Sequence, residues 1–422
     1  MSGSDAARLS ALRRELHRHA EPAFLEFATA WVIERETAHL ADVVRRGGDA
    51  IDLSRVVDLP SPSVADEWEA AAVAAGYPAD RIRWYRQNGT ASTVEIVGSR
   101  PGPTWGLRSD IDGLPFAESD AAGHVPAAAG FRSQTGAMHA CGHDAHTTIG
   151  IGLLERLADR DFPGRLRVVF QPAEEGVRGA AAMLDANALE GVDRMISLHV
   201  LGEKPTGWFV GSVTGGLATR KFRAKFTGAS AHAAVSPEHG RNALLSAAMA
   251  VTGVMALSRY GSADTRINVG TLHAGDSVNI VPSHATMTYE LRATDEGVLD
   301  DLDRRAAAVM RGAAAAHGVD VDVLVTGGAT VIDPDDRLVA ALVEAASAVP
   351  AIGPVTATMP QPGSDDVTLM IRAVQAAGGL GAYAAIGVDS PGTHHSPTFD
   401  LDERVLVTAV DLFENLVRSG AV

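Results

Sequence analysis

Short apolar runs alternate with helical stretches between about residues 100 and 200, and this alternation narrows the choice of fold more than any other pattern in the chain. Residues 104–108, 166–170 and 195–198 are such runs, and residues 147–157 have a helical pattern. Strands joined through helices pair in parallel, because the helix returns the chain to the end of the sheet where the previous strand began. We therefore predict an α/β domain with a mostly parallel sheet.

Each of the three apolar runs leads into residues that can carry chemistry. The first precedes Asp110 and Asp112, the second precedes Glu174 and Glu175, and the third precedes His199. In open α/β sheets, ligands bind beyond the carboxyl ends of the strands. The sequence therefore predicts that these carboxylates and the histidine share one site at that edge of the sheet.

A second pattern begins near residue 217. Strand-like and helical segments follow one another there in the order β-α-β-β-α-β, which is typical of a ferredoxin-like α+β domain. We predict a larger domain formed by residues 1–216 and 329–422, with residues 217–328 inserted as a smaller domain. The glycines near the two connections, Gly215 and Gly328, predict hinge motion of the inserted domain as a lid.

Composition excludes several classes of partner. Hydrophobic residues make up 46% of the 422 residues and charged residues 21%, which is typical of a globular chain. The net charge of −16 disfavours nucleic-acid binding, because an acidic surface repels phosphates. The sequence shows neither a secretory signal nor a run of apolar residues long enough to span a membrane. The single cysteine, Cys141, fits a reducing compartment, so we expect a cytoplasmic protein.

Residues 138–146, MHACGHDAH, combine one thiol, three imidazoles and a carboxylate. Cys141 and His143 are separated by one residue, and both are good ligands for divalent transition metals. Asp144 is a candidate for orienting one of these ligands from behind. A polar loop with a buried free cysteine is the competing interpretation, and for Cys141 alone it would be favoured. The density of ligand-type residues favours a metal site.

Glu174 and Glu175 are adjacent carboxylates after a buried-looking strand. Burying such a pair is costly unless it binds a cation. Because neighbouring side chains point in different directions, one can bind a metal while the other acts as a general base. A solvated acidic turn is the alternative, and the apolar run before the pair argues against it.

Other candidates are more isolated in the sequence. His199 and His395 would be structural histidines unless the fold brings them to the same place. In the inserted segment, His232 is followed by Asn279 and Arg292, and this combination suits an oxyanion and a carboxylate. Ordinary polar surface residues are the alternative for these three.

At these residues the chain resembles the dinuclear metallopeptidase family of aminoacylases and carboxypeptidases. Within that family it is most similar to the amidohydrolase branch of hippurate and indole-acetyl-amino-acid hydrolases. The motifs RSDIDGLP, MHACGHDAHT, FQPAEEG, GASAHAAVSPEHGRNA, VNIVP and GTHHSPTF occur in the family's order between about residues 8 and 415. The segment AEPAFLEFATA and the long stretch before Asn88 resemble the aminobenzoyl-glutamate hydrolase subgroup.

The resemblance implies two divalent ions per chain, manganese or zinc, with nickel or cobalt as alternatives. It assigns Cys141 as the bridging ligand and Glu174 as the general base. The remaining implied metal ligands are His143, Glu175, His199 and His395. His395 matches better than His394, because the expected ligand directly precedes Ser-Pro.

The resemblance also implies a homodimer through the inserted domain, in which His232 helps to hold the oxyanion in the partner's active site. Asn279 and Arg292 match substrate-binding positions, and Asp110 and Asp112 match aspartates close to the metals. The chain departs from the branch at residues 364–366, where Ser-Asp-Asp stands in place of Ser-Glu-Asp. This departure concerns local substrate contacts and not the metal site.

Together these features predict a metal-dependent hydrolase that cleaves the C–N bond of an N-aroyl or N-acyl amino acid with metal-activated water. Hydrolytic deamination of an electron-poor aromatic amine, of nitroanthranilate type, is the alternative chemistry. A third interpretation is an inactive binding protein or an inactive partner chain, and Glu174 and the full ligand set argue against it. The expected partners are a small aromatic or acyl-amino-acid substrate and a second copy of the chain, and a hetero-oligomer stays open.

Overall fold

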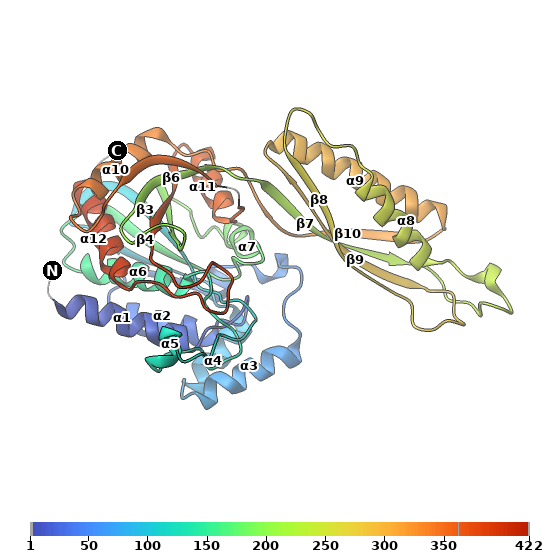
Figure 1. The fold of residues 1–422 in the computed structure, drawn as a ribbon, viewed down its shortest axis with the longest axis horizontal. Helices are drawn as coiled ribbons and strands as arrows, with labels where there is room; N and C mark the ends of the chain where they lie inside the picture. Colours follow the sequence, from blue (N-terminus) through green and yellow to red (C-terminus); the bar gives the residue numbers. More distant parts are fainter. Residues whose placement is uncertain (1–2, 362, 421–422) are drawn as a thin grey trace. The chain divides into compact units, whose positions relative to one another are not determined.

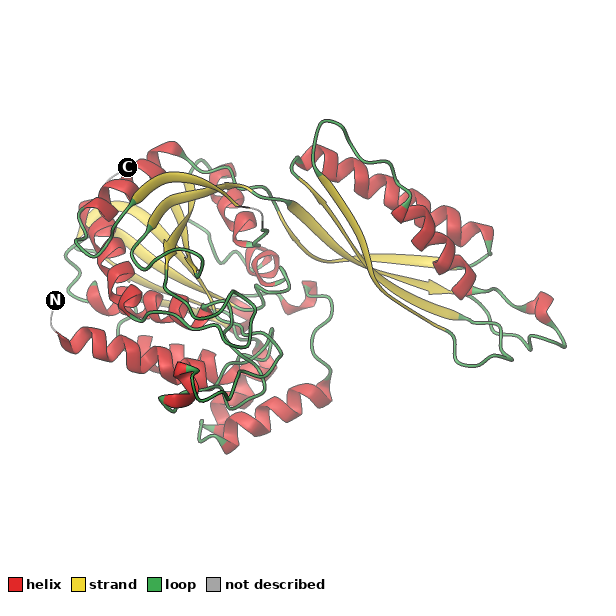
Figure 2. Ribbon diagram, in the orientation of Figure 1, coloured by secondary structure: helices red, strands yellow, loops and turns green. Residues whose placement is uncertain are grey.

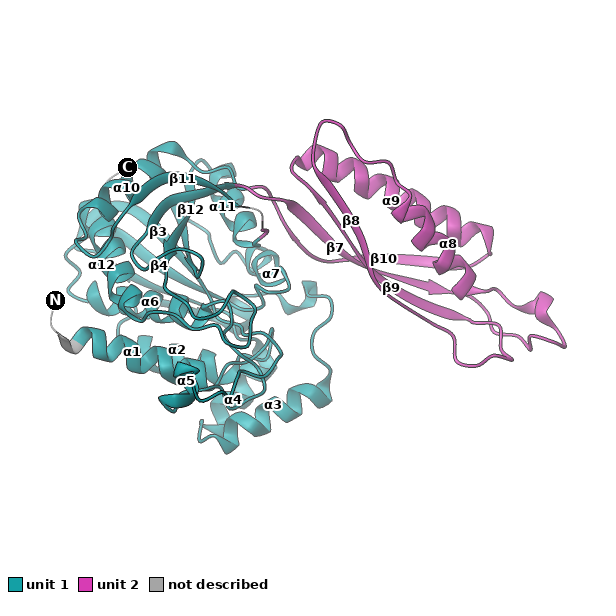
Figure 3. Ribbon diagram, viewed as in Figure 1, with its two compact units in different colours: residues 1–214, 332–361, 365–422 teal, residues 215–331, 362–364 magenta. Residues whose placement is uncertain are grey.

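The computed structural model describes residues 3–361 and 363–420, which divide into two compact units (Figure 1). Figure 3 colours them separately: residues 1–214, 332–361 and 365–422 form the first unit, and residues 215–331 and 362–364 form the second. The second unit thus begins at residue 215, against the predicted 217, and its main segment ends at residue 331, against the predicted 328.

The first unit is built on an eight-stranded sheet with the strand order β1-β2-β4-β3-β5-β12-β6-β11. Its strands are β1 (Val43–Arg46), β2 (Ser92–Val97), β3 (Arg100–Asp110), β4 (Pro163–Gln171), β5 (Arg194–Leu201), β6 (Phe209–Gly215), β11 (Val355–Gln361) and β12 (Leu380–Gly387). The four central strands, β4, β3, β5 and β12, pair in parallel, whereas the β1–β2, β2–β4 and β12–β6 pairs are antiparallel. The predicted α/β class with a parallel sheet is therefore confirmed at the centre of the unit.

Helices cover both faces of this sheet (Figure 2). One face packs against α1 (Gly3–Arg18), α2 (Phe27–Thr37), α6 (His143–Arg156), α10 (Asp336–Ser347) and α12 (Arg404–Ser419). The other face packs against α7 (Gly179–Asp185) and α11 (Val367–Ala376). All eight residues of β12 are buried, as expected for a parallel strand covered on both sides.

Two helices differ from the sequence-based expectation. Helix α6 begins at His143 and not at residue 147, so the second half of the MHACGHDAH motif forms its first turn. Gly142 precedes that turn with a φ of 86°, and a Cβ there would lie 2.4 Å from the Val200 side chain. Glycine is the residue that tolerates both conditions.

The polar segment between residues 47 and 91 has a pattern that predicts a helix only at about residues 63–75, which is α3 (Pro62–Ala74). The second helix of this segment, α4 (Ala79–Asn88), was not predicted. These two helices pack on α2 through an aromatic cluster that includes Trp31, Trp68 and Trp84. A short helix, α5 (Val125–Ala128), precedes the MHACGHDAH motif.

The second unit has the predicted β-α-β-β-α-β order. Its elements are β7 (Ala218–Thr227), α8 (Ala243–Met255), β8 (Thr265–Ala274), β9 (His284–Ala293), α9 (Glu296–Ala316) and β10 (Asp320–Ala329). The strands form an antiparallel sheet in the order β10-β7-β9-β8, and both helices pack on one face of it (Figure 2). Across the described residues, no helix combines the length and apolar character that crossing a bilayer requires.

Candidate dinuclear metal site

The predicted ligands, which lie far apart in the sequence, come together in the first unit. Cys141 lies with His143 and His199 in one group of potential ligand atoms, and with Glu175 and His395 in a second group. Within each group, the ligand atoms lie within 4.8 Å of one another. Because Cys141 belongs to both groups, its sulfur is placed where two adjacent cations would share it.

The hydrogen bonds of His143 leave one ring nitrogen free. Its Nδ1 lies 2.8 Å from the main-chain carbonyl of Asp112, which fixes the Nδ1–H tautomer. The Nε2 atom is buried and has no hydrogen-bond partner among the described residues, and the same holds for Oε1 of Glu175. Buried polar atoms are rarely left unpaired, so these two atoms fit a bound cation.

His199 and His395 each turn one ring nitrogen toward another candidate ligand. His199 Nδ1 lies 2.6 Å from the carbonyl of Val200, and its Nε2 lies 3.4 Å from the sulfur of Cys141. His395 Nε2 lies 3.4 Å from a carboxylate oxygen of Glu175. In the neighbouring His394, Nε2 accepts the Gly202 N–H at 3.1 Å, and the buried Nδ1 has no hydrogen-bond partner among the described residues. His395, and not His394, falls in the ligand group with Cys141 and Glu175, which agrees with the preference for His395.

His146 lies beside this site but has no free nitrogen. Its Nδ1 donates to Asp110 at 2.6 Å, and its Nε2 accepts the main-chain N–H of Val200 at 3.1 Å. Asp110 also pairs with the buried guanidinium of Arg108. We infer that His146 and Asp110 support the site from behind and bind no metal through these atoms.

The turn that carries Glu174 and Glu175 is held by two other buried carboxylates. Asp112 accepts the main-chain N–H groups of Glu174 at 2.9 Å and Glu175 at 3.2 Å. Glu26 accepts the N–H of Ala173 at 3.1 Å, and Ala173 has a φ of 57°. Asp112 was a candidate in the sequence because it follows a predicted strand. Nothing in the sequence around Glu26 indicated that its carboxylate contacts residue 173.

Negative charge is crowded around the general-base candidate. Burial and the nearby Asp365 raise the pKa of Glu174 well above its ordinary value, and burial raises the pKa of Glu175 to about 7. Burial likewise raises the pKa of the Cys141 thiol. These carboxyl groups and this thiol hold their protons because little positive charge lies near them. A bound cation would deprotonate them, since metal binding releases protons from its ligands.

Arg108 and Tyr383 were not predicted, yet both are buried and close enough to Glu174 to feel its charge. The Arg108 guanidinium pairs with Asp365 at 3.0 Å and Asp366 at 3.2 Å, and the Tyr383 hydroxyl donates to Asp365 at 2.5 Å. The divergent Asp365 is therefore held firmly against the site. In the sequence, Arg108 is the last residue of an apolar run. That position does not indicate that Arg108 neutralises carboxylates about 250 residues away.

Asp144 differs from its predicted role. Its carboxylate binds Arg13 and His17 of helix α1 at 2.7 Å each, and it hydrogen-bonds no candidate ligand among the described residues. Its contribution is therefore to attach α6, which carries His143, to α1. The physical reason is its place in the first turn of α6, from which the side chain points toward the face that α1 covers.

His17 connects Asp144 to Glu118 and predicts a pH dependence of stability. Its two ring nitrogens lie 2.7 Å from Asp144 and 3.0 Å from Glu118, so the doubly protonated ring satisfies both carboxylates. Burial and Arg13 act to lower the pKa of His17, but these two hydrogen bonds outweigh them and raise it. Two other rings lie near it, Phe131 at 5.6 Å and His139 at 6.4 Å between centroids.

We expect His17→Gln to destabilise the protein by about 3 kcal/mol at pH 6, because it removes one cationic partner from each of two buried carboxylates, Asp144 and Glu118. A pKa raised above the unfolded value contributes stability that is fully present below that value and is lost as the pH rises through the folded pKa. The difference in unfolding free energy between wild type and variant should therefore shrink from pH 6 to pH 9. Urea unfolding at several pH values measures it, and a difference that grows with pH would contradict the assignment.

The three candidates in the second unit do not lie together. His232 and Asn279 are neighbours, since Ala233 next to His232 donates its N–H to the Asn279 carbonyl at 3.0 Å. Arg292 lies near the far end of β9, and the strand from His284 to Arg292 spans about 27 Å. Residues 228–233 pair with residues 279–283, and this pair of segments extends β7 and β9 away from Arg292.

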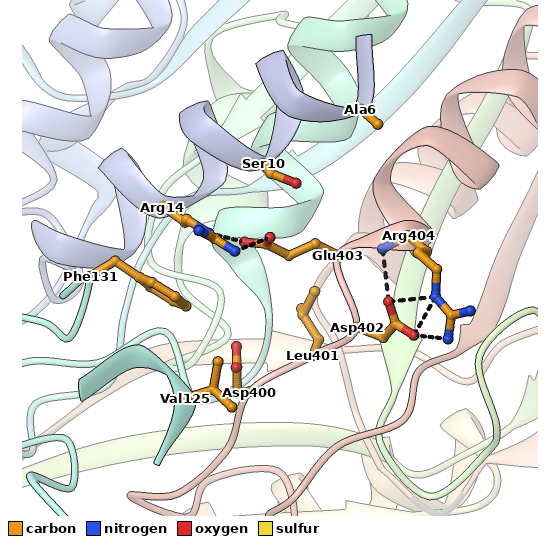
Figure 4. A pocket seen from close by; sticks show the side chains of 10 residues that line it. All are labelled: Ala6, Ser10, Arg14, Val125, Phe131, Asp400, Leu401, Asp402, Glu403 and Arg404. Atoms are coloured by element: carbon orange, nitrogen blue, oxygen red, sulfur yellow. Dashed lines mark hydrogen bonds and ion pairs between the residues drawn. The ribbon is translucent and has the colours of Figure 1, made fainter. Parts of the chain in front are cut away.

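A separate pocket of about 390 Å³ opens beside α1 and α5 (Figure 4). It is lined by Ala6, Ser10, Arg14, Val125, Phe131, Asp400, Leu401, Asp402, Glu403 and Arg404. Its charged groups are paired: Arg14 binds Glu403 through two hydrogen bonds of 2.8 Å, Arg404 binds Asp402, and Asp400 pairs with Arg13 outside the lining at 2.8 Å. None of the candidate ligands lines this pocket.

The sequence profile of peptidase family M20/M25/M40 matches residues 106–419, which include every residue of the two ligand groups. The chain belongs to this family. The resemblance inferred from the motifs is thereby confirmed.

Two relatives are similar to nearly the whole chain. It is 37% identical over 404 residues to the indole-3-acetyl-aspartic acid hydrolase of Enterobacter agglomerans, covering 94% of this chain and 92% of the relative. It is 36% identical over 410 residues to one of the subunits of the p-aminobenzoyl-glutamate hydrolase of Escherichia coli (strain K12), covering 96% of this chain and 94% of the relative.

Solved structures agree with this placement. The aminobenzoyl-glutamate utilization protein of Klebsiella pneumoniae matches with a TM-score of 0.84 and 31% identity, over 98% of this chain and 96% of that one. A Bacillus subtilis protein described as a dinuclear metal-binding peptidase of family M20 matches with a TM-score of 0.67 and 24% identity, over 99% of both chains, and supports the fold.

Proposed function

We propose that this chain is a metal-dependent hydrolase that cleaves the amide bond of N-aroyl or N-acyl amino acids. The observation that carries the proposal is the position of Cys141 in two groups of ligand atoms with Glu174 beside them. The indole-acetyl-aspartate and aminobenzoyl-glutamate hydrolases named among its relatives support this class of substrate.

Cys141, His143, His199, Glu175 and His395 would hold two divalent ions, manganese or zinc. Such ions supply Lewis acidity and lower the pKa of water. Because the Cys141 thiol must remain reduced to serve as a ligand, we place the enzyme in the cytoplasm.

Glu174 moves the proton in this proposal. Its carboxylate lies in one group with His143 and Glu175, where bound cations would keep it deprotonated, so it can accept a proton from the attacking water. The water oxygen forms a bond to the carbonyl carbon, the C–N bond breaks, and Glu174 delivers the proton to the leaving nitrogen. Asp112 holds the Glu174 main chain during these transfers.

His232 is suited to stabilise the developing oxyanion. Its Nδ1 accepts the N–H groups of Ala234 and Val235 at 3.2 Å each, so the proton lies on Nε2, and the side chain is exposed. An exposed Nε2–H is a donor available to a substrate oxygen. Arg292 would pair with the substrate carboxylate.

The distance between His232 and Arg292 supports a homodimer. One chain cannot bring both residues to a single small substrate, so a second copy would supply one of them. We propose that the copies meet through the second unit, where β8 is an edge strand and the α8 residues Leu245 and Met249 are each 50% exposed.

Complementation tests this arrangement. In a mixed dimer of Glu174→Gln and His232→Ala chains, one site combines an intact Glu174 with the other chain's intact His232, so about half of wild-type activity is expected. A wild-type chain paired with a chain that carries both substitutions should be inactive. Tandem affinity purification with two different tags isolates each mixed dimer for assay. The opposite pattern would show that His232 acts within its own chain.

The reaction class is tested by incubating the metal-loaded protein with N-aroyl amino acids and with anilines, while amino acid and ammonia are measured separately. We expect release of the amino acid without free ammonia. Ammonia release from an electron-poor aniline, with no amide cleavage, would overturn the proposal in favour of deamination.

A further inference from the structure

Two arginines stand directly opposite each other on the open face of the second sheet. Arg266 of β8 pairs in register with Arg292 of β9, and residues directly opposite in an antiparallel pair point to the same face with Cβ atoms about 5 Å apart. Their sequence neighbours Ile267 and Leu291 are buried under the helices, so the arginines lie on the face that α8 and α9 leave uncovered (Figure 1).

The two guanidinium groups are not equally neutralised. Arg292 pairs with Glu290 at 2.9 Å. Arg266 is exposed and makes one hydrogen bond, to the carbonyl of Thr265 at 3.0 Å, with no ion pair to any described residue. Like charges directly opposite each other destabilise a sheet, so this pair carries a cost that a bound anion would remove.

We propose that Arg266 is a specificity-determining residue that binds a second carboxylate of the substrate, so that the amino-acid half is dicarboxylic. This inference rests on the proposed function, in which Arg292 pairs with the α-carboxylate. An aspartyl or glutamyl moiety carries its second carboxylate one or two methylene groups further on. Two arginines on adjacent strands can each bind one of these two carboxylates, whereas a substrate with a single carboxylate would leave one arginine without a partner.

Neighbouring residues fit a dianion. Glu290 lies opposite Lys221 on β7 and Asn268 on β8, so it is surrounded by donors and does not cancel both arginines. Arginine suits this role because its planar fork binds a carboxylate through two parallel hydrogen bonds. A glutamine in place of the glutamate of the substrate would offer one acceptor and no negative charge.

The test compares hydrolysis of p-aminobenzoyl-glutamate and p-aminobenzoyl-glutamine, which differ by one carboxylate. In the Arg266→Gln dimer, the ratio of kcat/KM for glutamate to that for glutamine should fall by about 10–100-fold, mainly through KM. Arg266→Lys, which keeps the charge and loses the fork, should retain part of the preference. Arg266→Gln should not lower Tm, because it removes a like-charge contact.

Lys225→Gln is the matched control, since it removes one positive charge from the same open face about 20 Å further along β7. It should leave the ratio unchanged. The inference is overturned if Arg266→Gln leaves the ratio within twofold of wild type, or if Lys225→Gln changes it equally.

Failure of the proposed function would look different, because the wild type would then hydrolyse neither substrate. Calorimetric titration with the same two ligands still decides the inference in that case. A glutamate preference that depends on Arg266 upholds it, and equal affinities overturn it.

Discussion

Replacing Glu174 with glutamine is expected to lower kcat by about 10²–10⁴-fold while bound metal stays at the wild-type level. Glutamine keeps the shape of the side chain and its hydrogen-bonding capacity but cannot accept the proton. Steady-state assay of amino-acid release, combined with elemental analysis of the same preparation, measures both quantities.

Glu175→Gln is the matched comparison for this experiment, because it changes the adjacent residue in the same way. Glu175 lies in the ligand group with Cys141 and His395, so this variant should lose metal as well as activity. If Glu174→Gln retains wild-type turnover, or if it is the variant that loses metal, the roles assigned to the two carboxylates are wrong.

Replacing Cys141 with alanine should have the second largest effect, on metal content. Because the sulfur belongs to both ligand groups, its loss weakens both positions, and bound metal should fall well below two ions per chain. A ligand that binds the folded state stabilises it by mass action. The increase in Tm that added metal gives to the wild type should therefore be reduced or lost in Cys141→Ala.

His394→Gln is a control for this measurement, because His394 lies next to a ligand candidate but falls in neither of the two ligand groups that contain Cys141. Its metal content should stay near the wild-type value, whereas His395→Gln should lower it. Unchanged metal stoichiometry in Cys141→Ala would refute the bridging assignment.

The sequence predicted the parts of the fold and site that depend on local patterns. The apolar runs before Asp110, Glu174 and His199 form β3, β4 and β5, which pair in parallel. In β7 and β9, the alternation of apolar and polar residues determines which side chains face the helices and which lie on the open face. Helix α4 was missed because it is short and its apolar face consists mainly of aromatic residues, which gives a weak helical pattern. The helix is stabilised by packing on α2 and α3.

What the sequence by itself determined is the set of chemical groups: one thiol, several imidazoles and paired carboxylates, placed at strand ends that parallel topology brings to one edge. What only the tertiary structure decided is which of these groups are available. The nitrogen of His146 is occupied by the N–H of Val200, 54 residues away, and Asp144 is taken by Arg13 and His17 of another helix. Likewise, the register of β8 against β9 places Arg266 beside Arg292. Hydrogen bonds and ion pairs between distant segments exist only when the fold brings those segments together, so no local periodicity encodes them.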